Sequence, residues 1–268
     1  MDQLLLILSQ NFMKNALLVG VLVALCAALL GVLLVLRRYA MIGDGLSHVG
    51  FGALSIAYAL RLAPMAVAVP VVILSAFLLL SLAENNKIKG DSAIAVLSSA
   101  ALAAGVVASA LAGGSAADLN GYLFGSILAL EESDVILSVI LSAVVILLFL
   151  LFKNRIFAVT FDASFAKSCG VRVKFYNLLI ALLTAVTVVV GMRLVGTMLI
   201  SSLIIFPALS AMQISGSFRG VILLSALFSV AAFAVGLVLS TTLPAGAVIV
   251  LCNFALLLVC TVVAKVRN

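Results

Sequence analysis

An acid and an imidazole lie four residues apart in the stretch GDGLSHVG at positions 43–50. Residues at positions i and i+4 of a helix share one face, so Asp44 and His48 can act on the same ligand. A carboxylate oxygen and an imidazole nitrogen are suitable donors for zinc, manganese and ferrous ions. His48 is the only histidine in the chain. This pair is therefore the main candidate for a metal site.

Two ligands leave the coordination shell of a metal ion incomplete. The other ligands would be water, a second copy of the chain, or outer acids, namely Asp118, Glu131 and Glu132. A purely structural interpretation stays equally open. In that interpretation Asp44 caps a helix that starts at Gly45 near the membrane surface, and His48 is a hydrogen-bonded packing residue.

The composition indicates that these residues lie in a membrane. Hydrophobic residues make up 66% of the 268 positions and charged residues only 9%, whereas soluble domains are about 45–50% apolar and about 25% charged. The values exclude a soluble enzyme, a nucleic-acid-binding protein and a disordered protein. The four cysteines form no C-x-x-C motif, which argues against a disulfide or a thiolate metal site.

Nine apolar stretches approach or exceed the roughly 20 residues that a helix needs to cross a bilayer. They lie at 15–36, 39–61, 64–83, 92–112, 133–152, 172–191, 194–213, 218–239 and 244–264. Because open sheets cannot span lipid, we predict an all-α polytopic membrane protein with a single transmembrane domain, 1–268. A re-entrant pair at 61–64 or 191–194 would reduce the nine spans to eight.

The second span carries the pair to lipid depth if it begins near Tyr39. At a rise of about 1.5 Å per residue, Asp44 lies roughly 9 Å and His48 roughly 15 Å beyond Arg38. A carboxylate at that depth costs about 2.5–3.5 kcal/mol on insertion scales, so it indicates a function.

The basic residues predict the orientation. With the amino terminus outside the cell, all but three of the 15 basic residues are cytoplasmic, in agreement with the positive-inside rule. The exceptions are Lys14, Arg61 and Arg193. The carboxyl terminus is then cytoplasmic, and the segment 113–134, which has acids and no Lys or Arg, is external. The net charge of +6 is therefore an orientation signal of a cell-membrane protein, with no nucleic acid implied.

The longest internal loop, 153–174, contains a predicted short helix. Asp162 lies near its start and Gly170 near its end, as suits a helix terminus. Four residues share one side of it: Phe161, Phe165, Ala166 and Cys169. This face can lie on the bilayer or dock onto a soluble partner, and its aromatics slightly favour the partner.

Pro207 falls inside the seventh span and should kink it by freeing the carbonyl of Leu203. The neighbouring Ser201, Ser202 and Ser210 can supply hydrogen bonds there. The kink serves either packing or a bend along a translocation path. Elsewhere the chain has no Gly-Lys dipeptide, so it cannot form a Walker A loop, and no nucleophile–base pair is recognisable. We therefore expect no enzymatic activity.

Four ordered blocks resemble the ABC-3 metal-ion permeases, the membrane subunits of zinc and manganese ABC importers. They are VLRRYAMIGDGLSHVGFGAL at 35–54, LNGYLFGSIL at 119–128, RLVGTMLISSLIIFPALSA at 193–211 and LPAGAVIVL at 243–251. The loop FDASFAKSCGV at 161–171 is similar to the loop of that family that contacts the ATPase.

The resemblance implies a permease that imports zinc or manganese, with iron as a further option, and that binds no permanent cofactor. Its partners would be cytoplasmic ATPase subunits, an extracytoplasmic solute-binding protein, membrane lipid and a second permease chain, expected to be identical. Asp44 and His48 match the family's residues for metal passage. Five residues match its coupling region: Phe161, Asp162, Phe165, Ala166 and Gly170. The alternative is a stand-alone proton-coupled transporter in which Asp44 and His48 relay protons.

Overall fold

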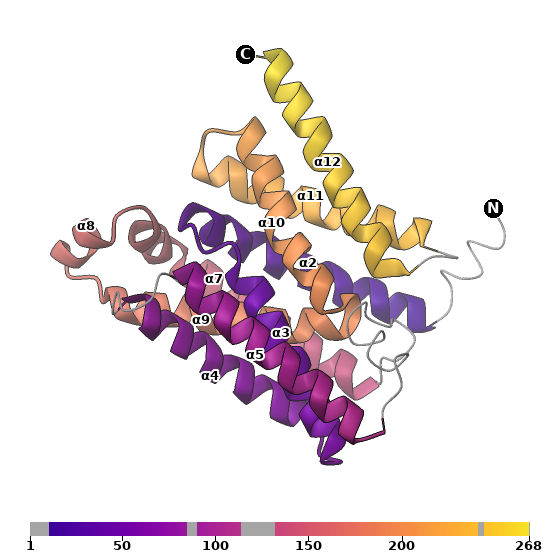
Figure 1. The fold of residues 1–268 in the computed structure, drawn as a ribbon. Coiled ribbons are helices and arrows are strands. Elements are labelled where there is room, and N and C mark those ends of the chain that lie inside the picture. The colour runs from indigo at the N-terminus through magenta and orange to yellow at the C-terminus, as the bar shows by residue number, and fades with distance from the viewer. Residues whose placement is uncertain (1–10, 85–89, 114–131, 241–243, 268) are drawn as a thin grey trace.

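The computed structural model describes residues 11–84, 90–113, 132–240 and 244–267, and the regular structure in these ranges is all helical. Figure 1 shows the helices packed side by side as a bundle. They are α2 (Asn11–Leu36), α3 (Ile42–Ala59), α4 (Pro64–Glu84), α5 (Gly90–Leu111), α7 (Glu132–Phe161), α8 (Ala163–Ser168), α9 (Val173–Val195), α10 (Thr197–Ile214), α11 (Phe218–Leu239) and α12 (Ala245–Arg267).

Each of the nine predicted spans coincides with one of the long helices, so the all-α polytopic class is confirmed. Six of these helices, in the part of the chain that is described, are long and apolar enough to cross a membrane: α2, α5, α7, α9, α11 and α12. The apolar parts of α4 and α10 are shorter. Helix α3 is less apolar because it carries the acid, the histidine and several glycines and serines.

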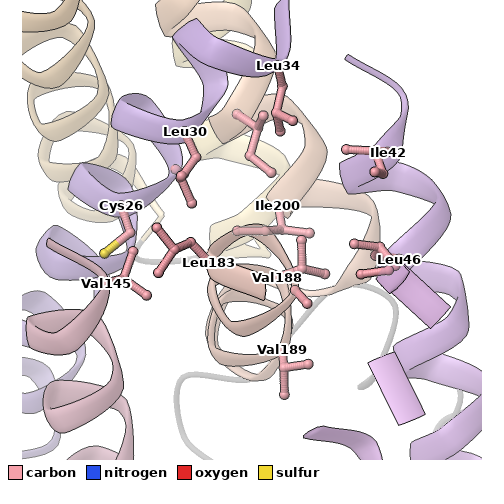
Figure 2. Packing of buried hydrophobic residues seen from close by; sticks show 14 of the residues in the cluster. Cys26, Leu30, Leu34, Ile42, Leu46, Val145, Leu183, Val188, Val189 and Ile200 are labelled. Carbon is pink, nitrogen blue, oxygen red and sulfur yellow. The ribbon is translucent and has the colours of Figure 1, made fainter. Parts of the chain in front are cut away.

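The centre of the bundle is formed by α2, α9 and α10, with α3 packed against α9 and α10. Helices α2 and α9 are mostly buried, whereas α5 and α12 expose most of their length. Figure 2 shows this core: Leu30 of α2, Leu46 of α3, Leu183 of α9 and Ile200 of α10 meet in one cluster. Helix α3, which carries the acid–histidine pair, therefore packs against the core of the bundle.

Gly31, Gly52 and Gly105 allow their helices to pack backbone against backbone. A Cβ atom on Gly52 of α3 would lie 2.5 Å from the carbonyl oxygen of Ala101 in α5, and Gly105 of α5 faces the Cα of Gly52 in return. A Cβ atom on Gly31 of α2 would collide with the carbonyl of Ile204 in α10. Small residues permit such close helix packing in lipid, and here they fix α3 and α10 in the bundle.

Two predicted boundaries are wrong. Helix α3 begins at Ile42 rather than near Tyr39, because residues 37–41 form a turn in which Arg38 adopts a left-handed conformation (φ 62°). Helix α7 continues through Lys153 and Arg155 to Phe161, so the first part of the expected 153–174 loop is helical. Lys153 and Arg155 do not end the helix, because their long side chains can reach water while the helical backbone hydrogen bonds continue past them.

Parts of α2, α7, α9 and α11 meet at one end of the bundle, and we call it the basic end because Arg37, Arg155 and Arg219 lie there. There Arg37, directly after α2, is hydrogen-bonded to Thr160 of α7 and Asn177 of α9. At the same end Phe161 of α7 contacts Phe218 at the start of α11. The ends of four helices therefore meet where the orientation analysis places the cytoplasmic loops.

Candidate functional site: an acid–histidine pair beside a buried helix start

Asp44 and His48 lie one turn apart on α3, as their spacing predicts. The Nε2 atom of His48 is 3.7 Å from Oδ2 of Asp44, and the side chains are 15% and 33% exposed, respectively. This distance is too long for a hydrogen bond. An ion with bonds of about 2.0–2.2 Å to both atoms would hold them roughly 3–4 Å apart. The separation of the pair is therefore compatible with a shared metal ion.

Ser201 of α10 completes the immediate surroundings of the carboxylate. Its hydroxyl donates a hydrogen bond to Oδ1 of Asp44 over 3.2 Å. One carboxylate oxygen is thus held by α10, while the other faces the imidazole. Sequence reasoning considered Ser201 only as a partner for the kink at Pro207. No local signal links it to Asp44, because the two residues are 157 positions apart.

The turn between α9 and α10 lies inside the bundle. Gly196 forms it with a φ of 92°, a conformation that favours glycine, and both Gly196 and Thr197 are buried. Helix α10 therefore starts in the interior, and Ser201 is only one turn from that start. Asp44 is itself in the first turn of α3. Two helix N-termini converge near the carboxylate, and each favours a negative charge there.

The capping interpretation of Asp44 is wrong. Helix α3 starts at Ile42, not Gly45, and its N-cap residue, Met41, makes no side-chain cap. The depth estimated for Asp44 in the membrane also becomes smaller. It assumed a helix that begins near Tyr39, whereas Asp44 belongs to the first turn of α3. The neighbouring turn of α3 still packs in the interior: a Cβ atom on Gly50 would collide with Met192 of α9, a residue that is 2% exposed.

The imidazole has an unused nitrogen. Among the described residues the buried Nδ1 atom of His48 has no hydrogen-bond partner, which argues against the alternative of a hydrogen-bonded packing residue. A neutral imidazole carries one proton and one lone pair. With the proton on Nδ1, the lone pair of Nε2 points toward the carboxylate and is free to accept a cation.

The donor set remains small. Among the described residues no group of three or more His, Cys, Asp or Glu side chains could hold a metal ion. Glu132 is exposed at the start of α7, whereas Asp118 and Glu131 lie outside the described ranges. Within the described ranges the structure thus brings together two of the predicted donors, Asp44 and His48, and the source of any further ligand stays a prediction.

The predicted short helix of the internal loop is present as α8, at the left edge of Figure 1. Asp162 caps it, accepting a hydrogen bond of 2.8 Å from the backbone N–H of Phe165. Gly170 follows it with a φ of 79°. The prediction of one shared contact face is wrong, because Ala166 is 1% exposed against the bundle while Phe165 is 66% exposed.

Phe161 belongs to α7 rather than to the short helix. Its ring lies 4.6 Å from that of Phe157 and 5.8 Å from that of Phe218, measured between centroids. This three-ring cluster, Phe157, Phe161 and Phe218, joins α7 to the start of α11 beside α8. Phe218 was missed from the sequence, since nothing in its own segment indicates the contact.

Pro207 lies within α10, which continues as a helix on both sides of it. Of the serines expected to serve the freed carbonyl, Ser201 binds Asp44 instead, and Ser202 donates to the carbonyl of Leu199. A translocation role for the bend stays a prediction.

The sequence profile of the ABC 3 transport family matches residues 9–264. The chain belongs to the ABC 3 transport family. It is 30% identical over 251 residues to the manganese import system permease protein ScaB of Streptococcus gordonii, covering 93% of this chain and 90% of the relative. It is 31% identical over 272 residues to a "Probable iron transport system membrane protein" of Haemophilus influenzae, covering 99% and 98%. The solved structure of PsaBC from Streptococcus pneumoniae in complex with Fab matches with a TM-score of 0.87 and 30% identity, covering 100% and 99%.

Membership of the ABC 3 family confirms a multi-pass membrane permease that is not itself an ATPase. As part of an ABC transporter, it works with a separate ATPase subunit. The stand-alone proton-coupled transporter is therefore no longer needed to explain the acid–histidine pair.

Proposed function

We propose that this chain is the permease subunit of an ABC importer for a divalent transition-metal ion, and that Asp44 and His48 bind the ion during its passage. Manganese is the first candidate, because ScaB is named a manganese permease. Iron is the next, because the Haemophilus influenzae relative is named for iron. Zinc suits the same two donors.

The single observation behind this proposal is the 3.7 Å gap between the Nε2 atom of His48 and the Oδ2 atom of Asp44. The two side chains are partly exposed and are not hydrogen-bonded to each other. This arrangement suits the binding of a cation better than a role in packing. A site with only two protein ligands also binds weakly enough to release the ion, as conduction requires. A second copy of the chain, facing the first, would double the donors around the pore.

The driving motion enters at α8 in this proposal. Phe165 is exposed on a capped helix that projects from the basic end, which suits an ATPase subunit docking from the cytoplasm. With the basic end inside the cell, the amino terminus lies outside. An extracytoplasmic binding protein would then deliver the ion to the acidic segment 113–134, whose charge attracts cations.

Substitutions of the pair test the proposal. Asp44→Asn and His48→Gln keep nearly the same volume but remove the negative oxygen or the imidazole lone pair. We expect each to reduce cellular uptake of radioactive manganese at least tenfold, since each removes one of the two donors that the described residues bring together. Uptake of zinc and ferrous iron, measured in the same cells, identifies the preferred ion.

The matched control is Ser55→Ala, two turns beyond His48 on α3, where the buried hydroxyl has no hydrogen-bond partner among the described side chains and backbone. It should transport normally. The metal role of the pair is refuted if Asp44→Asn and His48→Gln are present in the membrane at wild-type amounts and accumulate each metal at wild-type rates.

A further inference from the structure

Arg37 occupies the junction between the internal hairpin and the turn that leads to the metal pair. It directly follows α2, and only residues 37–41 separate α2 from α3, whose first turn contains Asp44. The residue is half-buried at the basic end. A displacement of this short turn must therefore move the start of α3.

The guanidinium binds both helices that flank α8. Its Nε donates to Oγ1 of Thr160 over 3.2 Å, one residue before the end of α7. Its Nη1 donates to Oδ1 of Asn177 over 2.7 Å, in the second turn of α9. Thr160 in turn donates to the carbonyl of Ile156, so its oxygen is oriented to accept from Arg37.

The environment of this guanidinium is unusual for a residue that only stabilises the fold. Both acceptors are neutral, and the buried Nη2 atom has no hydrogen-bond partner in the part of the chain that the structure describes. Burial lowers the pKa of Arg37 from its usual value, which reflects the cost of removing the cation from water. Such a charge adds little stability and is better explained by a need for fixed geometry.

We propose that Arg37 is the positioning residue that transmits movement of the α7–α8–α9 hairpin to the α2–α3 turn and so to Asp44. The inference rests on the proposed function, in which the ATPase acts on α8. The planar fork of the guanidinium holds α7 and α9 at once. When the hairpin moves, the turn follows, and α3 shifts against Ser201 of α10.

The test compares ion transport with ATP use in the intact transporter. The permease is purified with its ATPase subunits and placed in liposomes, and the extracytoplasmic binding protein is added. Uptake of manganese, zinc and ferrous iron is then measured together with ATP hydrolysis on the same vesicles. We expect Arg37→Gln to retain ATP hydrolysis but to lower the ions imported per ATP by about tenfold, within the usual range of coupling between sites. Arg38→Gln removes the same charge from an exposed neighbour in the same turn and should leave the ratio unchanged.

A milder pair of variants guards against misfolding. Thr160→Val removes the oxygen that accepts from Arg37 and keeps the side-chain shape. Thr261→Val is its control, because Thr261 makes the same bond to a carbonyl four residues earlier, to Leu257, in exposed α12. We expect Thr160→Val to lower the ratio several-fold and Thr261→Val to leave it unchanged.

The outcomes separate the inference from the function beneath it. Wild-type vesicles that hydrolyse ATP without importing any of the three metals overturn both. Wild-type import with an unchanged ratio in Arg37→Gln and Thr160→Val overturns the role of Arg37 alone. A parallel fall in ATP hydrolysis and uptake, with the ratio preserved, also overturns it, because that pattern indicates a purely structural residue.

Discussion

Replacing Ser201 with alanine removes the hydroxyl that orients the carboxylate of Asp44. The bond joins α10 to α3 and leaves Oδ2 directed toward His48. Without it the carboxylate can rotate, so part of the binding energy of the ion must be used to fix the side chain again. We expect weaker metal binding with an unchanged maximal rate.

The magnitude follows from the geometry. Hydrogen bonds to charged groups contribute about 1.5–3 kcal/mol. This bond, at 3.2 Å, is longer than the usual O–H···O range, and Asp44 is one-third exposed, so water replaces part of it. We therefore expect about 1 kcal/mol, which raises the metal concentration for half-maximal uptake about fivefold.

The assay is initial-rate manganese uptake as a function of concentration in vesicles that contain the whole transporter. The control is Ser202→Ala, the next residue of α10, whose hydroxyl donates to the carbonyl of Leu199 in its own helix. Equal half-maximal concentrations in the Ser201→Ala, Ser202→Ala and wild-type proteins would show that the carboxylate needs no orientation from α10.

Two other substitutions test the helix packing and the docking surface. Gly52→Ala places a Cβ atom 2.5 Å from the carbonyl oxygen of Ala101, so we expect it to destabilise the permease by about 1–3 kcal/mol. Its midpoint of thermal unfolding in detergent should be lower than that of Gly216→Ala, where the added atom meets nothing within 4 Å. Equal midpoints would contradict the close contact. Phe165→Asp replaces the exposed ring of α8 with a charge and should abolish co-purification of the ATPase subunit. Its control, Ser164→Asp, adds the same charge at the preceding residue and should not. Retention of the ATPase by both variants would refute docking at Phe165.

The sequence was sufficient for the properties that depend on local chemistry. Long apolar runs have no stable alternative to helices in lipid, so the all-α class and the nine long helices of the described residues follow from the apolar runs. The spacing of Asp44 and His48 places them on one face of any helix. The same holds for α8, because a capping acid at 162 and a glycine at 170 define the ends of a helix without help from the rest of the chain.

Only the tertiary structure decided which distant residues meet those local features. Ser201 reaches Asp44, and Arg37 reaches Thr160 and Asn177, across more than 100 positions of sequence. In a membrane every face of an apolar helix can contact lipid at a similar free energy. Hydrophobicity therefore does not indicate which face packs against which neighbouring helix. The choice is made by backbone contacts such as Gly31 on Ile204 and by the buried turn at Gly196, which together bring the start of α10 beside the carboxylate.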